Sequence, residues 1–82
     1  MYDYNIWTEN SPQKFKNICK IIEKEFPNIE KEELLIDVDG STIQTYRQHG
    51  KTINVFDDYD IGAVFVKSEI DLNEILPLSP FC

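Results

Sequence analysis

The sequence has little of several features that mark well-known classes of protein. Among its 82 residues are two cysteines, one histidine and three glycines. No apolar run approaches the ~20 residues of a membrane span, and the N-terminus lacks the basic region and apolar stretch of a signal peptide. Two cysteines are too few for the disulfide framework of a small secreted domain. We therefore expect thiols and a cytoplasmic protein.

Basic residues are also scarce. Eight lysines and arginines face 15 aspartates and glutamates, which gives a net charge of −7. The excess acid lies in residues 27–40 and 57–82, whereas residues 11–26 are rich in lysine. Such a surface repels nucleic acid and anionic membranes and attracts a basic protein. The simpler interpretation is that the acidic residues keep the protein in solution.

Hydrophobic periodicity predicts one α+β domain over residues 1–76, followed by a tail at 77–82. Residues 2–7 alternate with the period of a strand. Ser11-Pro12 is a typical helix start and Pro27 a stop. Between them, five apolar residues fall on one helical stripe: Phe15, Ile18, Cys19, Ile22 and Phe26.

Four further strands are expected at residues 34–39, 42–48, 51–57 and 61–68. Their short connections, including His49-Gly50, can join only antiparallel neighbours. Asp71 and Glu74 resemble the capping pair of a helical turn that ends at Leu76. The predicted architecture is β-α-β-β-β-β, an antiparallel sheet with one helix packed on one face.

Alternation along the strands assigns the side chains to two sheet faces. The predicted core face is almost wholly aliphatic and contains Tyr4, Ile6, Leu34, Ile36, Val38, Ile43, Ile53, Val55, Val64 and Val66. The opposite face mixes large apolar residues (Trp7, Leu35, Tyr46, Phe56, Phe65) with polar ones (Asp37, Gln44, Gln48, Thr52, Asn54, Lys67). One helix cannot cover both faces, and this mixture is typical of protein interfaces. Alternatively, the C-terminal segment folds back over the second face through Leu72, Ile75, Leu76, Leu78 and Phe81.

One stretch suggests an enzyme. Residues 34–42 resemble the first motif of haloacid-dehalogenase-like phosphotransferases, an apolar strand followed by Asp-x-Asp-Gly. The resemblance implies Asp37 as nucleophile, Asp39 as acid–base and magnesium held between carboxylates, to which Asp57-Asp58 could contribute. That family has a doubly wound parallel sheet, which a hairpin meander with one helix does not provide. Asp39-Gly40 in a hairpin turn explains the same residues, and we expect no enzyme and no catalytic residue.

Metal and cofactor sites are not expected either. Residues 37–40 and 57–60 supply too few spaced ligands for a calcium loop, although weak metal binding stays open. His49 has no second histidine with which to build a zinc site.

The most distinctive feature is Asp57-Asp58-Tyr59-Asp60 at a hairpin tip. Three carboxylates repel one another there unless a cation relieves them, and an ordinary solvated turn is the simpler interpretation. As a functional site, the tip would pair with Lys or Arg of a partner, with aromatic anchors nearby. The predicted partner-binding residues are Asp57, Asp58, Tyr59, Asp60, Tyr46, Phe56, Trp7, Glu69 and Asp71.

In size, acidity and layout the chain resembles the small immunity proteins that bacteria pair with toxins, including those of contact-dependent growth inhibition. The resemblance implies a cognate toxin as partner, often a basic nuclease, neutralised in a 1:1 complex. Two alternatives stay open. The chain could be a homo-oligomeric structural or regulatory module, or a DNA mimic whose carboxylates occupy the site of a nucleic-acid-binding protein.

Overall fold

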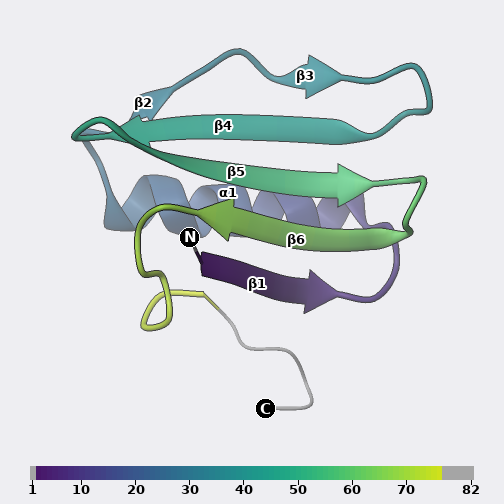
Figure 1. The fold of residues 1–82 in the computed structure, drawn as a ribbon, viewed down its shortest axis with the longest axis horizontal. Helices are drawn as coiled ribbons and strands as arrows, with labels where there is room; N and C mark the ends of the chain where they lie inside the picture. The colour runs from purple at the N-terminus through teal and green to yellow at the C-terminus, as the bar shows by residue number, and fades with distance from the viewer. Residues whose placement is uncertain (1, 77–82) are drawn as a thin grey trace.

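The structure, a computed structural model, describes residues 2–76 and consists of one helix packed on one antiparallel sheet (Figure 1). The predicted α+β fold with one helix on one face is confirmed. The C-terminal tail predicted at 77–82 lies outside the described residues. The elements are β1 (Tyr2–Trp7), α1 (Pro12–Glu25), β2 (Glu30–Lys31), β3 (Leu35–Ile36), β4 (Thr42–Gln48), β5 (Lys51–Asp58) and β6 (Ala63–Ser68).

Strand order in the sheet is β1-β6-β5-β4-β2, and β3 pairs with β4 beside β2. The first and last long strands are therefore neighbours, and α1 crosses behind the sheet to reach its other edge (Figure 1). His49 and Gly50, both with positive φ, form the two-residue turn between β4 and β5. This turn sets the register Gln48↔Lys51 from which the rest of the hairpin follows.

Helix α1 begins and ends where the sequence predicts. The backbone N–H of Lys14 donates to Ser11 Oγ at 3.1 Å, so Ser11 is the N-cap. Phe15, Ile18 and Ile22 are buried against the sheet. Leu72 and Leu76 join this core from one turn after β6, in which the Leu76 N–H donates to the Leu72 carbonyl. The described part of the C-terminal segment thus packs in the core and leaves the other sheet face open.

Two predictions about the strands are wrong. The strand expected at 34–39 is reduced to the two residues of β3, and Leu34, Ile36 and Val38 are exposed instead of buried. The two-residue strand β2, at Glu30–Lys31, lies in a segment expected to be a connector. On β4 the faces are reversed. Tyr46 and Gln44 face the helix and are buried, whereas Ile43 lies opposite Phe56 on the open face. The His49-Gly50 turn imposes this, because Tyr46 must then lie opposite the core residue Ile53.

Candidate functional site

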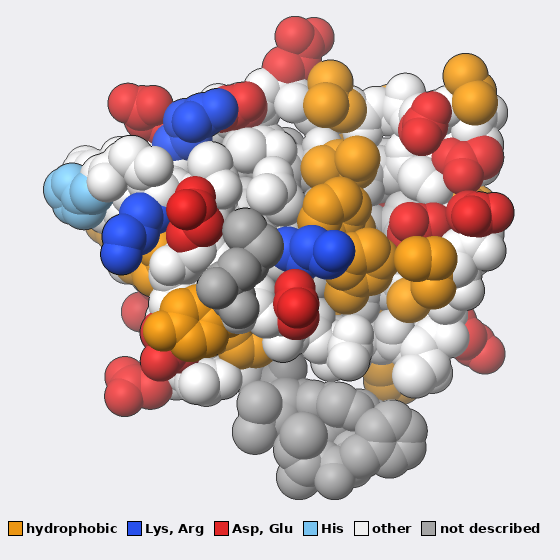
Figure 2. Space-filling model, viewed as in Figure 1, with side chains coloured by type: hydrophobic (Ala, Val, Ile, Leu, Met, Phe, Trp, Pro, Cys, Tyr) orange, Lys and Arg blue, Asp and Glu red, His pale blue; other side chains and the backbone are white. Residues whose placement is uncertain are grey.

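An apolar row crosses the open face of the sheet. Leu35, Ile43, Phe56 and Phe65 lie side by side through the cross-strand pairs Leu35↔Ile43, Ile43↔Phe56 and Phe56↔Phe65. The two phenylalanine rings stack with centroids 4.7 Å apart, and Leu35 is 58% exposed at the sheet edge. Figure 2 shows the row as a band of hydrophobic side chains on the face away from the helix. We call these four residues the apolar row.

Two turns meet beside the apolar row and form what we call the acidic tip, residues 37–41 and 58–61. The Tyr59 N–H donates to Ser41 Oγ at 2.8 Å, which joins the turns. Asp39 Oδ1 accepts the Ser41 N–H at 2.9 Å, and this bond lowers the pKa of Asp39. Asp58 Oδ1 accepts the N–H groups of Asp60 and Ile61. These bonds hold the two turns in shape.

A shallow pocket of about 270 Å³ connects the acidic tip to the apolar row. Ile43 and Phe56 form part of its wall. The rest is polar and includes four carboxylates, those of Asp37, Asp39, Asp58 and Asp60. An apolar strip with carboxylates along one side suits a cationic side chain with an aliphatic stem, as lysine and arginine have.

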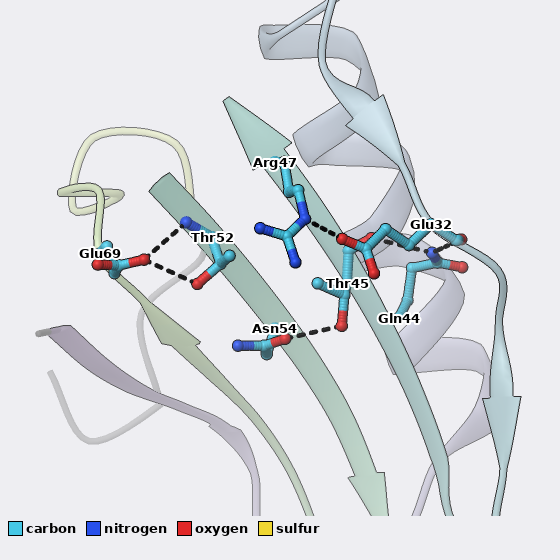
Figure 3. Close-up of polar contacts among 7 residues, drawn as sticks. All are labelled: Glu32, Gln44, Thr45, Arg47, Thr52, Asn54 and Glu69. Atoms are coloured by element: carbon cyan, nitrogen blue, oxygen red, sulfur yellow. Dashed lines mark hydrogen bonds and ion pairs between the residues drawn. The ribbon is translucent and has the colours of Figure 1, made fainter. Parts of the chain in front are cut away.

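On the other side of the row, the open face is polar (Figure 3). Thr45 Oγ1 donates to Asn54 Oδ1 at 2.8 Å across β4 and β5. Further from the tip, Arg47 forms an ion pair with Glu32. The apolar row therefore has a polar rim, which is the usual anatomy of a protein-binding surface.

Two residues predicted to bind the partner are buried instead. Asp57 is 2% exposed, and its Oδ1 accepts the backbone N–H of Ser11 at 3.1 Å, so it anchors the start of α1. Tyr46 is fully buried under the helix, where its hydroxyl donates to Glu23 Oε2 at 2.6 Å. Neither side chain is accessible to a partner in this fold, because both lie on the helix-facing side of the sheet.

The other predicted residues lie in different parts of the molecule. Asp58, Tyr59 and Asp60 are in the acidic tip, and Phe56 is in the apolar row beside it. Trp7 lies toward the helix, with the Lys14 ammonium 4.4 Å from its ring centroid.

Glu69 and Asp71 lie at the opposite end of the sheet from the tip. Glu69 Oε1 accepts the Thr52 N–H and hydroxyl, both at 2.9 Å, which lowers the pKa of Glu69. Asp71 accepts the Asn73 N–H and the Tyr4 hydroxyl. The sequence-based list thus combined one surface with residues that hold the fold together, and it omitted Leu35, Asp37, Asp39, Ile43 and Phe65 from that surface.

Within residues 2–76 no group of three or more His, Cys, Asp or Glu side chains is placed to hold a metal ion, the acidic tip included. Every strand pairing in this range is antiparallel, unlike the sheet that the phosphotransferase motif requires. No helix in the same range is long and apolar enough to cross a membrane. Comparison with known proteins found no match to a family model, a curated protein or a solved structure.

Proposed function

We propose that this protein is a stoichiometric inhibitor of a basic partner protein, of the kind that bacterial immunity proteins represent, and that it acts in the cytoplasm. The observation that carries the proposal is the apolar row, in which Leu35 is exposed and the other three side chains are half-buried, and which lies beside the acidic tip. A partly exposed apolar strip with a polar rim is typical of an interaction site. The net charge of −7 favours a cationic partner.

The two parts of the surface have different tasks in this proposal. Phe56 and Phe65 supply apolar area that becomes desolvated, which stabilises the complex once formed. The carboxylates of the acidic tip attract the partner and speed the encounter. A nuclease groove that binds phosphate is cationic, so carboxylates placed against it compete directly with the nucleic acid. Inhibition then needs no catalytic group, only a complex that lasts longer than the exposure to toxin.

The proposal is tested on a captured partner that is then purified. The tagged chain is the bait in an extract of the source organism, and each captured protein is assayed for 1:1 binding and for loss of its own activity. We expect a basic protein whose association slows about tenfold or more between about 50 and about 500 mM NaCl. A captured protein that binds without losing activity would contradict the inhibitor proposal.

Two matched pairs of variants locate the surface. Asp37→Asn with Asp60→Asn should slow association, whereas Glu25→Gln with Glu74→Gln removes the same charge from exposed sites elsewhere and should have less effect. Phe56→Ala should weaken binding by about 30-fold, equivalent to about 2 kcal/mol, while Tyr2→Ala removes an exposed aromatic from the edge strand β1 with little effect. Unchanged affinity in both Phe56→Ala and Phe65→Ala would exclude the apolar row as the interface.

A further inference from the structure

A second surface, of opposite charge, lies between α1 and the chain that follows β2. It is a groove of about 330 Å³ whose apolar side chains are Phe15, Cys19 and Leu34, and its polar lining consists of Lys16, Lys20, Lys31, Glu23 and Gln44. We call it the lysine groove. Lys31 is paired with Glu23 at 3.2 Å, but among residues 2–76 neither Lys16 nor Lys20 has an acidic partner. These two lysines are four residues apart on α1, so they repel each other.

The chemistry of the lysine groove defines what it would bind. An apolar floor between ammonium groups suits a small apolar side chain flanked by carboxylates. Such a segment exists on this same chain. Val38 in the acidic tip is fully exposed, and its neighbours are Asp37 and Asp39. The Asp37 N–H donates to the Ser41 carbonyl at 2.8 Å and the Gly40 N–H to the Asp37 carbonyl at 3.0 Å, so the turn that presents Val38 is formed in advance.

We propose that the acidic tip of one copy docks in the lysine groove of a second copy. Val38 enters the apolar floor, and Asp37 and Asp39 pair with Lys16 and Lys20. The contact joins two different surfaces, so it is head-to-tail: the first copy keeps its groove free, the second keeps its tip free, and further copies can add at either end. Since the tip is also part of the proposed inhibitor surface, self-association would cover it until a tighter basic partner displaces the second copy. The self-association itself does not depend on that proposed function.

Sedimentation velocity of the full chain over a concentration series tests the contact. We expect reversible association that is concentration-dependent at about 20 mM NaCl and at least about tenfold weaker at about 500 mM NaCl. Val38→Lys removes the apolar side chain and places a positive charge between Asp37 and Asp39, at a fully exposed site, so the variant should fold and stay monomeric. Lys16→Glu with Lys20→Glu should do the same from the groove side. Lys24→Glu with Lys51→Glu, the charge-matched control at exposed sites outside the groove, should still associate.

Mixing the two monomeric variants gives the decisive result. The Val38→Lys copy keeps an intact groove, and the Lys16→Glu, Lys20→Glu copy keeps an intact tip, so the mixture should form a 1:1 heterodimer that neither variant forms alone. Wild-type protein that stays monomeric up to about 1 mM would overturn the proposal. Association that survives both variants but is lost in Phe56→Asp would also overturn it, because the copies would then meet through the apolar row.

Discussion

Tyr46 shows how a polar side chain can be fully buried without loss of stability. Its hydroxyl donates to the carboxylate of Glu23 at 2.6 Å, and Glu23 in turn pairs with Lys31. Tyr46→Phe keeps the ring but removes this bond, so we expect the free energy of unfolding to fall by about 1 kcal/mol. This is less than is usual for a hydrogen bond to a charged group, because Glu23 is partly exposed to water. Urea denaturation at neutral pH measures it. Tyr59→Phe, an exposed tyrosine in the acidic tip, should leave stability unchanged.

The same bond predicts a pH dependence. The Tyr46 hydroxyl, followed by Lys31, lowers the pKa of Glu23 below its ordinary value. A carboxyl group with a lowered pKa in the folded state stabilises the fold above its unfolded pKa, and this contribution is lost as the pH falls through the folded value. The stability difference between wild type and Tyr46→Phe should therefore shrink from about pH 7 to about pH 3. A difference that grows on acidification would contradict this assignment.

Asp57 is an acidic residue that stabilises the fold and takes no part in the proposed binding surface. Its side chain is 2% exposed and bonds the Ser11 N–H, so Asp57→Ala leaves a buried donor unpaired at the start of α1. We expect a loss of about 2 kcal/mol by chemical denaturation. Asp57→Asn keeps an acceptor and should lose less. Asp60→Ala, two residues beyond Asp58 and exposed, should lose little. Equal losses at positions 57 and 60 would show that Asp57 does not anchor the helix.

Among the elements, β2 and β3 are held most weakly. Each pairs with β4 over two residues, and the chain between them is attached by Gln44, whose Nε2 donates to the Glu32 carbonyl at 2.6 Å. Because this edge is exposed, its amides should exchange hydrogen much faster than those of β5. Gln44→Ala should accelerate exchange further in residues 30–36 while β1 and β6 stay protected. Arg47→Ala, which removes only an exposed ion pair with Glu32, is the control and should change exchange little.

Local signals in the sequence were sufficient for α1, for the strand order along the chain and for the His49-Gly50 hairpin. The face of β4 was predicted wrongly because Ile43 and Tyr46 are both apolar and lie on opposite sides of the strand. The turn contains the missing information. A two-residue loop at 49–50 places Tyr46 opposite Ile53 and Ile43 opposite Phe56, and it thereby reveals the apolar row.

The edge segment could not be predicted in the same way. Residues 34–38 alternate like a buried strand, yet Val38 and Ile36 are exposed because the segment lies at the edge of the sheet, where the helix leaves a groove instead of cover. Periodicity reports what a strand could bury and not how far the helix reaches across the sheet. Asp57 is different, because alternation along β5 places it on the same face as Ile53 and Val55. That signal was available in the sequence, and the bond to the Ser11 N–H shows why a carboxylate is tolerated there.

At the scale of the whole molecule, charge is segregated. The lysines of α1 line one surface and the carboxylates of the acidic tip another, on a chain of net charge −7. Both proposed contacts use the tip, one with a basic partner and one with the lysine groove of a second copy. Removing tip carboxylates should therefore weaken both, whereas changing the lysine groove should weaken self-association alone.

This segregation should also cost stability in the isolated chain. Four carboxylates share the wall of one pocket, and Asp60 is an exposed member of the set. Asp60→Asn relieves repulsion among them, so we expect the melting temperature to rise by about 1–3 °C at about 20 mM NaCl. The gain should vanish at about 500 mM NaCl, because the salt already screens the repulsion between the carboxylates. Glu25→Gln, which removes one exposed charge at the end of α1 away from the tip, should give a smaller gain. Calorimetry at both salt concentrations measures the difference. A gain in melting temperature that persists in high salt would mean that the backbone of the turn causes it. A gain confined to low salt would mean that the carboxylates of the tip repel one another and lower the stability of the fold. Residues that destabilise a fold in this way are typical of a binding surface.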